Sequence, residues 1–76
     1  MTNTNSKISF KRTKDSRGWY EYHFEKGDNT CDIKMVYGIR DYWTVFINGW
    51  EKYGTEKLAD ARKWAKFEIM LRGWVK

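Results

Sequence analysis

The sequence predicts an α+β fold in which an antiparallel meander of four or five strands packs on one C-terminal helix. Apolar and polar residues alternate over residues 7–54, which is the period of a β-strand, and turn-forming residues interrupt this alternation at four places. Residues 55–72 instead have a helical period. Residues 1–6 are polar and show neither period, so we expect a disordered tail and a single domain over residues 7–76.

Four strands are predicted from the alternation, over residues 7–13, 19–25, 31–37 and 42–47. Side chains two residues apart share a face of a strand, so the larger apolar residues mark the face that packs on the core. The residues expected on this face are Ile8, Phe10, Tyr20, Tyr22, Phe24, Ile33, Met35, Trp43, Val45 and Ile47. The opposite face is expected to carry Trp19, Lys34, Val36, Tyr42, Thr44 and Phe46 beside the acidic Glu21, Glu25 and Asp32.

Asn48 and Gly49 predict a tight hairpin, because a type I′ turn requires positive φ at both central residues. We expect a short fifth strand over residues 50–53 to pair back after this turn. Gly54 then leads into the helix, with Thr55 as its N-cap.

The predicted helix has a core-facing stripe at spacings of three and four residues, with Trp64 and Leu71 at its edge. The stripe consists of Leu58, Ala61, Ala65 and Ile69. Glu68 and Arg72 are spaced as a helical ion pair. Gly73 suits the left-handed position after a helix, and Trp74 is expected to fold back on the last turn as in a Schellman motif.

Phe67 and Met70 do not belong to this stripe and project among Arg62, Lys63 and Lys66. Two interpretations stay open for them. Either the ends of the strands or Trp74 cover the two apolar side chains, or they form a contact surface for a second protein chain.

The composition indicates a small protein with a large aromatic content, because its 76 residues include five tryptophans, five tyrosines and four phenylalanines. Cys31 is the single cysteine and alternates with Ile33 and Met35, so we interpret it as a buried apolar residue. A lone cysteine and the lack of an apolar run of membrane length predict a cytoplasmic protein without a membrane partner.

The net charge of +5 is distributed unevenly, with +4 in residues 1–17, −2 in residues 18–54 and +3 in residues 55–76. Both ends are basic and the middle is mildly acidic. Such an asymmetry is expected of a chain that meets an anionic partner with its N-terminal strand and its helix, although scattered lysines also serve solubility.

The residues predict neither catalysis nor a bound cofactor. His23 is the one histidine, and no spacing brings a serine, cysteine or carboxylate to it as a catalytic group. Glu21, His23 and Glu25 share a strand face, but cross-strand pairing on a solvated surface explains them better than a metal site. The sequence also has no glycine-rich phosphate loop and no zinc-binding spacing, so we expect no enzyme, metal or cofactor.

The outer face of the predicted sheet favours a binding function. If the helix covers one face, Trp19, Tyr42 and Phe46 remain on the uncovered one. Bases stack on such rings while neighbouring basic residues bind phosphates. The carboxylates on the same face favour the alternative, which is an aromatic patch for a protein partner or for self-association.

Five segments carry a resemblance to a known family: Tyr37-Gly38-Ile39-Arg40, Trp43-Thr44-Val45-Phe46-Ile47, Tyr53-Gly54-Thr55, the alanine-rich residues 58–64, and Leu71-Arg72-Gly73. Together, residues 37–73 resemble the ethylene-response-factor type of DNA-binding domain, whose relatives occur in phage integrases and homing endonucleases. The resemblance implies a three-stranded sheet that packs on a C-terminal helix and lies in the major groove, with Arg40 and Trp43 at positions that contact DNA. The small size and aromatic content are also similar to small phage-encoded proteins that bind host factors.

We therefore expect a small, basic, non-enzymatic protein that binds nucleic acid, with DNA favoured over RNA. The contact residues expected are Lys7, Lys11, Arg12, Lys14, Arg17, Trp19, Lys34, Arg40, Tyr42 and Phe46. The alternative is a protein-binding module, such as a phage-encoded inhibitor of a host enzyme or defence factor, that is monomeric or weakly dimeric. Its contact residues would be Trp19, Val36, Tyr42, Phe46, Phe67 and Met70.

Overall fold

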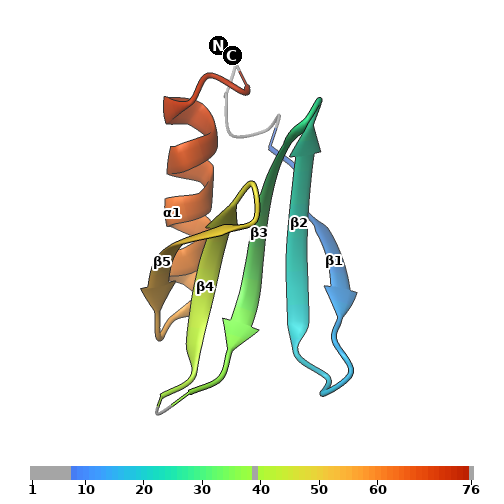
Figure 1. Ribbon diagram of the computed structural model, residues 1–76, viewed down its shortest axis with the longest axis vertical. Coiled ribbons are helices and arrows are strands. Elements are labelled where there is room, and N and C mark those ends of the chain that lie inside the picture. The colour runs from blue at the N-terminus through green and yellow to red at the C-terminus, as the bar shows by residue number, and fades with distance from the viewer. Residues whose placement is uncertain (1–7, 39, 76) are drawn as a thin grey trace.

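A computed structural model describes residues 8–38 and 40–75, in which five antiparallel strands form one sheet and a single helix packs on it (Figure 1). The strands neighbour one another in chain order, so the sheet is a meander and the predicted α+β class is confirmed. The expected tail over residues 1–6 lies outside the described residues, as does Lys7. The elements are β1 (Lys11–Lys14), β2 (Tyr20–Lys26), β3 (Asn29–Val36), β4 (Tyr42–Ile47), β5 (Trp50–Thr55) and α1 (Leu58–Leu71).

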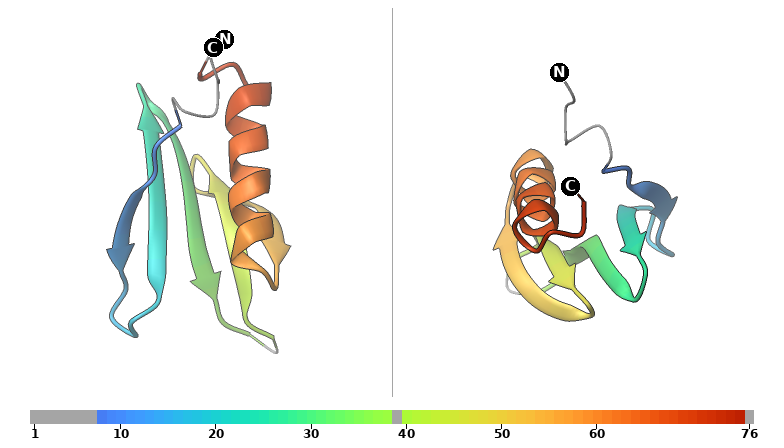
Figure 2. Two further views of the ribbon diagram at one scale, coloured as in Figure 1. Left: turned by 180° about the vertical axis from the view of Figure 1, so that it is seen from behind. Right: turned by 90° about the horizontal axis from the view of Figure 1, so that it is seen from above.

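The registers confirm the predicted core side of the central strands. Tyr22, Ile33, Val45 and Tyr53 are successive cross-strand partners from β2 to β5 and therefore share the side that faces α1. The helix lies on this side of the sheet (Figure 2). The buried core consists of Ile8, Phe24, Cys31, Ile33, Trp43, Val45, Ile47, Ala61, Ala65 and Ile69.

The hairpin between β4 and β5 has the predicted conformation, with φ of 52° at Asn48 and 84° at Gly49. Asn48 also ties the turn to the start of β3, because its side-chain oxygen accepts a hydrogen bond from the Thr30 N–H at 2.7 Å. The register shifts between Val45 and Phe46, which leaves Lys52 opposite neither of them. This irregularity bends β5 at the edge of the sheet.

The helix begins later than predicted. β5 continues to Thr55, which pairs with Trp43, so Thr55 is the end of a strand rather than an N-cap. Lys57 occupies the N-cap position and makes no side-chain capping bond. The hydroxyl of Thr55 instead accepts a hydrogen bond from the Lys57 N–H at 3.3 Å, which holds the turn between β5 and α1.

The end of the helix confirms the predicted Schellman motif. Gly73 has a φ of 72°, and its N–H donates to the Met70 carbonyl at 3.0 Å. The Trp74 N–H donates to the Ile69 carbonyl at 3.2 Å, and Trp74 packs against the core as expected.

The first strand is shifted from its predicted position over residues 7–13. β1 covers Lys11–Lys14, while Ile8 is buried just before it and Phe10 packs on Phe24 with ring centroids 6.1 Å apart. Strand pairing extends to Lys14 because Asp15 closes the turn to β2. Its carboxylate accepts hydrogen bonds from the N–H groups of Arg17 at 2.8 Å and Trp19 at 2.9 Å.

Candidate nucleic-acid interface

The helix lies over one half of the sheet. Its principal contacts are with β3, β4 and β5, while β1 and β2 extend to the other side of it (Figure 2). Tyr53 of β5 stacks on Trp64 of α1, with ring centroids 5.1 Å apart, and this contact holds the helix toward β5. As a result, α1 leaves the helix-side surface of β1 and β2 largely uncovered, and this surface lies beside the helix.

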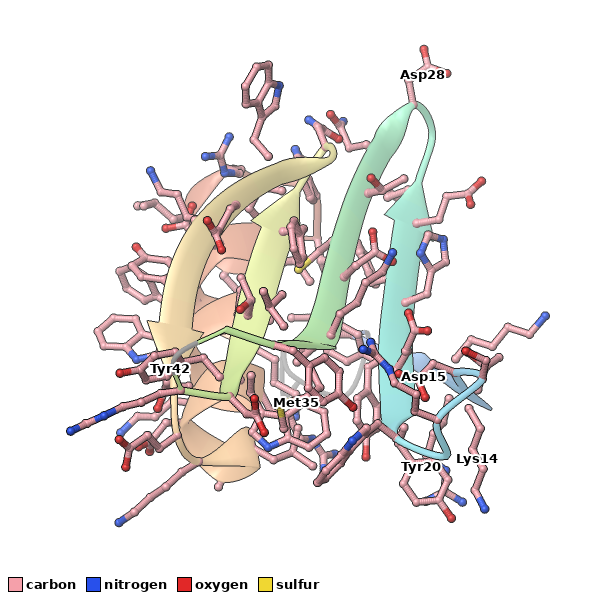
Figure 3. All side chains as sticks on the ribbon, turned by 60° about the horizontal axis from the view of Figure 1, so that its bottom comes forward. Lys14, Asp15, Tyr20, Asp28, Met35 and Tyr42 are labelled. Carbon is pink, nitrogen blue, oxygen red and sulfur yellow. The ribbon has the colours of Figure 1, made fainter. Side chains whose placement is uncertain are left out.

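Two cations of β1 lie on this helix-side surface. Arg12 and Lys14 are the register partners of Tyr22 and Tyr20, so the four side chains share one face. The guanidinium carbon of Arg12 lies 4.5 Å from the centroid of the Tyr20 ring, and Lys14 Nζ lies 5.2 Å from it. Both distances are within the range of cation–π attraction. Figure 3 shows Lys14 beside Tyr20 at this end of the sheet.

The helix brings further cations to the same surface. Arg62 projects toward β2, and its guanidinium carbon lies 5.7 Å from the centroid of the Tyr22 ring. Lys66 follows one turn later on the same flank. Arg62, Lys63, Lys66 and Ala59 line a surface hollow of about 350 Å³. Tyr22 therefore lies between a cation of β1 and a cation of α1.

We call this surface the basic strip, and it consists of Arg12, Lys14, Tyr20, Tyr22, Arg62 and Lys66. Among the described residues, no carboxylate forms an ion pair with any of its four cations. The acidic residues of β2, Glu21 and Glu25, pair with Thr13 and Thr30 on the opposite face. Asp28 lies at the far tip of the β2–β3 hairpin (Figure 3).

The opposite face of the sheet carries charges of both signs. His23 Nδ1 lies 2.5 Å from Asp32 Oδ1 and Nε2 lies 3.1 Å from Glu25 Oε1, so a protonated imidazole donates to both carboxylates. These hydrogen bonds, with that to Asp32 the larger cause, raise the pKa of His23 above its ordinary value of 6.5. Lys34 Nζ lies 3.9 Å from Glu21 Oε2. A polyanion on this face would meet three carboxylates beside the cations.

The aromatic surface predicted for this outer face is smaller than expected. Tyr42 and Phe46 are both partly buried. Thr44 between them is buried, contrary to the prediction, because its small side chain lies on an interior strand among larger neighbours. Trp19 does not join them, because it precedes β2 and packs toward the core. Its ring makes a T-shaped contact with Trp43, a core residue on the helix side, with ring centroids 5.9 Å apart.

The structure brings together only part of the predicted contact set. Arg40 Nη1 forms an ion pair with Glu56 Oε1 at 3.3 Å, and the guanidinium carbon of Arg17 lies 3.5 Å from the centroid of the Tyr37 ring. Lys11 is the register partner of His23 and points to the outer face. Arg12 and Lys14 belong to the basic strip. Arg62 and Lys66 were not in the predicted contact set, although the charge distribution indicated that the helix would meet an anionic partner, and Tyr20 and Tyr22 were predicted on the core face. A simple signal in the sequence could have identified the two cations of β1. Ile8 and Phe10 point inward, and the same alternation, carried on along the strand, places Arg12 and Lys14 on the helix side as well.

A second surface of α1 is apolar and borders the cations Lys63 and Lys66. Phe67 and Met70 are 50% and 42% exposed, so neither the strand ends nor Trp74 covers them. Leu71 is 68% exposed, and Trp50, at the end of β5 nearest the C-terminal end of α1, is 79% exposed (Figure 1). Trp64, Phe67, Met70 and Leu71 lie three or four residues apart along α1, and the rings of Trp64 and Phe67 meet edge-on with centroids 6.2 Å apart. We call these four side chains the apolar edge.

The groups available for covalent or metal chemistry are few in the described part of the chain. Cys31 is buried, and burial raises the pKa of its thiol to about 12, so the reactive thiolate is not formed at neutral pH. The described residues contain no group of three or more His, Cys, Asp or Glu side chains placed to hold a metal ion. With 14 residues, α1 is neither long nor apolar enough to span a membrane.

No family model, curated protein or solved structure matches this chain. The arrangement of its own side chains is therefore the basis for the function proposed below.

Proposed function

We propose that this protein binds nucleic acid through the basic strip. The observation that carries the proposal is the convergence of Arg12 and Lys14 from β1 with Arg62 and Lys66 from α1. Cations that are not paired with carboxylates attract the phosphate backbone, and the release of counterions makes such binding favourable at low salt. The tyrosine rings between these cations offer surfaces on which bases stack.

The charge distribution along the chain supports the same surface. Residues 1–17 and residues 55–76 are the two basic segments of the sequence, and β1 and α1 belong to these segments. The fold brings cations from both segments to the helix side of the sheet, whereas most carboxylates of the middle strands point to the outer face. An anionic ligand is therefore attracted to one side of the molecule.

Lys14 and Lys11 provide a matched test. Both are exposed and lie on β1, but Lys14 faces the basic strip and Lys11 faces the outer side. Lys14→Gln and Lys11→Gln remove the same charge from opposite faces. We expect fluorescence anisotropy with a labelled oligonucleotide of about 16 nucleotides to show weaker binding for Lys14→Gln and a salt slope lower by about one. We expect Lys11→Gln to bind like the unmodified protein.

Two results would contradict this proposal. One is that the unmodified protein fails to bind any oligonucleotide, single-stranded or duplex, at low salt. The other is that Lys11→Gln and Lys14→Gln weaken binding equally, because the contact would then depend on net charge rather than on the basic strip.

A second candidate function is protein binding through the apolar edge, and the partner that the charges favour is a second copy of this chain. Copies that each carry a charge of +5 repel one another. The charged residues nearest the apolar edge, Asp60 and Lys63, have opposite signs and lie beside Trp64 and Phe67, so this surface itself adds little to the repulsion. We expect sedimentation equilibrium to show a dimer that Phe67→Gln weakens and that Tyr42→Gln, on the outer face, does not. A monomer at every concentration tested would exclude this candidate.

A further inference from the structure

We infer that the basic strip takes a single strand of nucleic acid in preference to a duplex, an inference that rests on the proposed function. The strip lies in the angle between α1 and the part of the sheet that the helix leaves uncovered (Figure 2). Proteins that contact the bases of a duplex insert a projecting helix or β-ribbon into a groove. The tyrosines of the strip do not project in this way, because cations of β1 and α1 flank them.

The spacing of the two tyrosines also fits an extended strand. Tyr20 and Tyr22 are two residues apart on β2, which places them about 7 Å apart along the strand. Successive bases of a duplex strand are stacked about 3.4 Å apart. Rings at twice that spacing match bases that have been separated from their neighbours, as happens when a single strand is bound in an extended form.

Tyr20 is the residue on which we expect the principal base to stack. Tyr20 is 38% exposed, whereas Tyr22 is half-buried beneath Arg62. The planar guanidinium of Arg12 lies over the Tyr20 ring, and its outer face is a second surface of the kind on which unpaired bases stack. Lys14, on the other hand, has a compact charge that suits a phosphate.

The test compares single-stranded oligo(dT) and oligo(U) with a duplex of the same length, using anisotropy at several salt concentrations. We expect at least one of the single strands to bind at least about tenfold more tightly than the duplex, and the ratio of oligo(dT) to oligo(U) identifies the preferred sugar. Tyr20→Leu is expected to weaken single-strand binding about 5- to 150-fold without changing the salt slope, because the lost ring carries no charge. Tyr20→Phe, which keeps the ring, is expected to retain the affinity.

Tyr42→Leu, on the outer face, is the control and should bind like the unmodified protein. Thermal unfolding of each variant shows whether it remains folded, and Tyr20→Phe keeps the test informative if Tyr20→Leu does not. Equal affinity for duplex and single strands would overturn this inference and leave the proposed function standing. Unchanged binding by a folded Tyr20→Leu would do the same. Failure to bind every oligonucleotide would overturn both.

Discussion

At the scale of single residues, Glu68 is the feature of the core that the sequence indicates least. The residue is 3% exposed and lies among the apolar positions of α1. The Tyr53 hydroxyl donates to Glu68 Oε2 at 2.9 Å, and Arg72 Nε donates to Glu68 Oε1 at 3.0 Å. The spacing of Glu68 and Arg72 predicts their pair, but the part of Tyr53 depends on how β5 lies against the helix.

Replacement of Glu68 by alanine is expected to lower the free energy of unfolding by about 1–3 kcal/mol, because the Tyr53 hydroxyl and Arg72 lose their partner. Tyr53→Phe is expected to cost less, about 1 kcal/mol, since Glu68 keeps its bond to Arg72. Urea denaturation of both single variants and the double variant measures the coupling. An alanine variant as stable as the unmodified protein would contradict the arrangement.

The same triad predicts a response to acid. Burial raises the pKa of Glu68, but the hydrogen bonds from Tyr53 and Arg72 outweigh it and hold this pKa below its ordinary value of 4.5. The stability that Glu68 contributes is therefore present at neutral pH and is lost as the pH falls through the lowered pKa.

His23 predicts a pH dependence of the opposite sign. Because hydrogen bonds to Asp32 and Glu25 raise the pKa of His23, its contribution to stability is fully present below about pH 6.5 and is lost as the pH rises through the raised pKa. We expect the urea midpoint of the unmodified protein to fall between about pH 6 and pH 8 by more than that of His23→Gln. Equal slopes for the two proteins would show that the imidazole contacts contribute nothing.

At the scale of elements, local chemistry decided which predictions succeeded. The bounds of β4, the Asn48-Gly49 turn and the Schellman motif at Gly73 were predicted correctly, because each depends on residues that are adjacent in sequence. The N-cap at Thr55 was wrong because pairing of Thr55 with Trp43 extends β5, and that pairing is a contact between distant residues. β1 begins later than predicted because its pairing with β2 starts only at Lys11, opposite His23, whereas its end at Lys14 follows from the local turn at Asp15.

Gly49 and Gly54 allow the turn chemistry to be tested within one hairpin. A Cβ at Gly49 meets no atom within 4 Å, so Gly49→Ala is expected to destabilise the protein only through its φ of 84°, by about 1–2 kcal/mol. At Gly54 a Cβ makes ordinary contacts of 3.8 and 3.9 Å with Tyr42. Gly54→Ala is therefore expected to be neutral or stabilising by up to about 1 kcal/mol. Thermal unfolding of the two variants checks this, and equal effects would contradict the turn type.

At the scale of the whole molecule, the lateral position of the helix determines which surface is available for binding. Alternation assigned most side chains to the correct face, but it does not say which half of that face α1 covers. The stacking of Trp64 on Tyr53 and the short connection from β5 place α1 on the β3–β5 half. For this reason the sequence indicated the outer face as the open surface, whereas the helix side of β1 and β2 carries the cations that are not paired with carboxylates.

In the absence of an anionic ligand, the basic strip should lower the stability of the folded protein, because its cations repel one another. Raising the NaCl concentration from about 10 mM to about 150 mM shortens the screening length from about 30 Å to about 8 Å, so this repulsion decreases. Screening also weakens exposed ion pairs such as those of Lys34 with Glu21 and of Arg40 with Glu56, but such pairs contribute little. We therefore expect the melting temperature to rise by about 2–4 °C over this range.

Lys14→Gln and Lys11→Gln again separate the strip from the net charge. Lys14 lies among the cations of the strip, so Lys14→Gln should reduce the salt-induced rise in melting temperature. Lys11 lies beside His23 and its carboxylates on the outer face, so the rise for Lys11→Gln should be larger than for Lys14→Gln. Scanning calorimetry of both variants at the two salt concentrations measures the difference. A melting temperature that falls with salt, or an equal response in both variants, would show that the strip does not strain the fold. If Lys14→Gln instead reduces the salt effect and also weakens oligonucleotide binding, the same cation both binds the ligand and destabilises the free protein. Such a trade-off between stability and binding is common at functional sites.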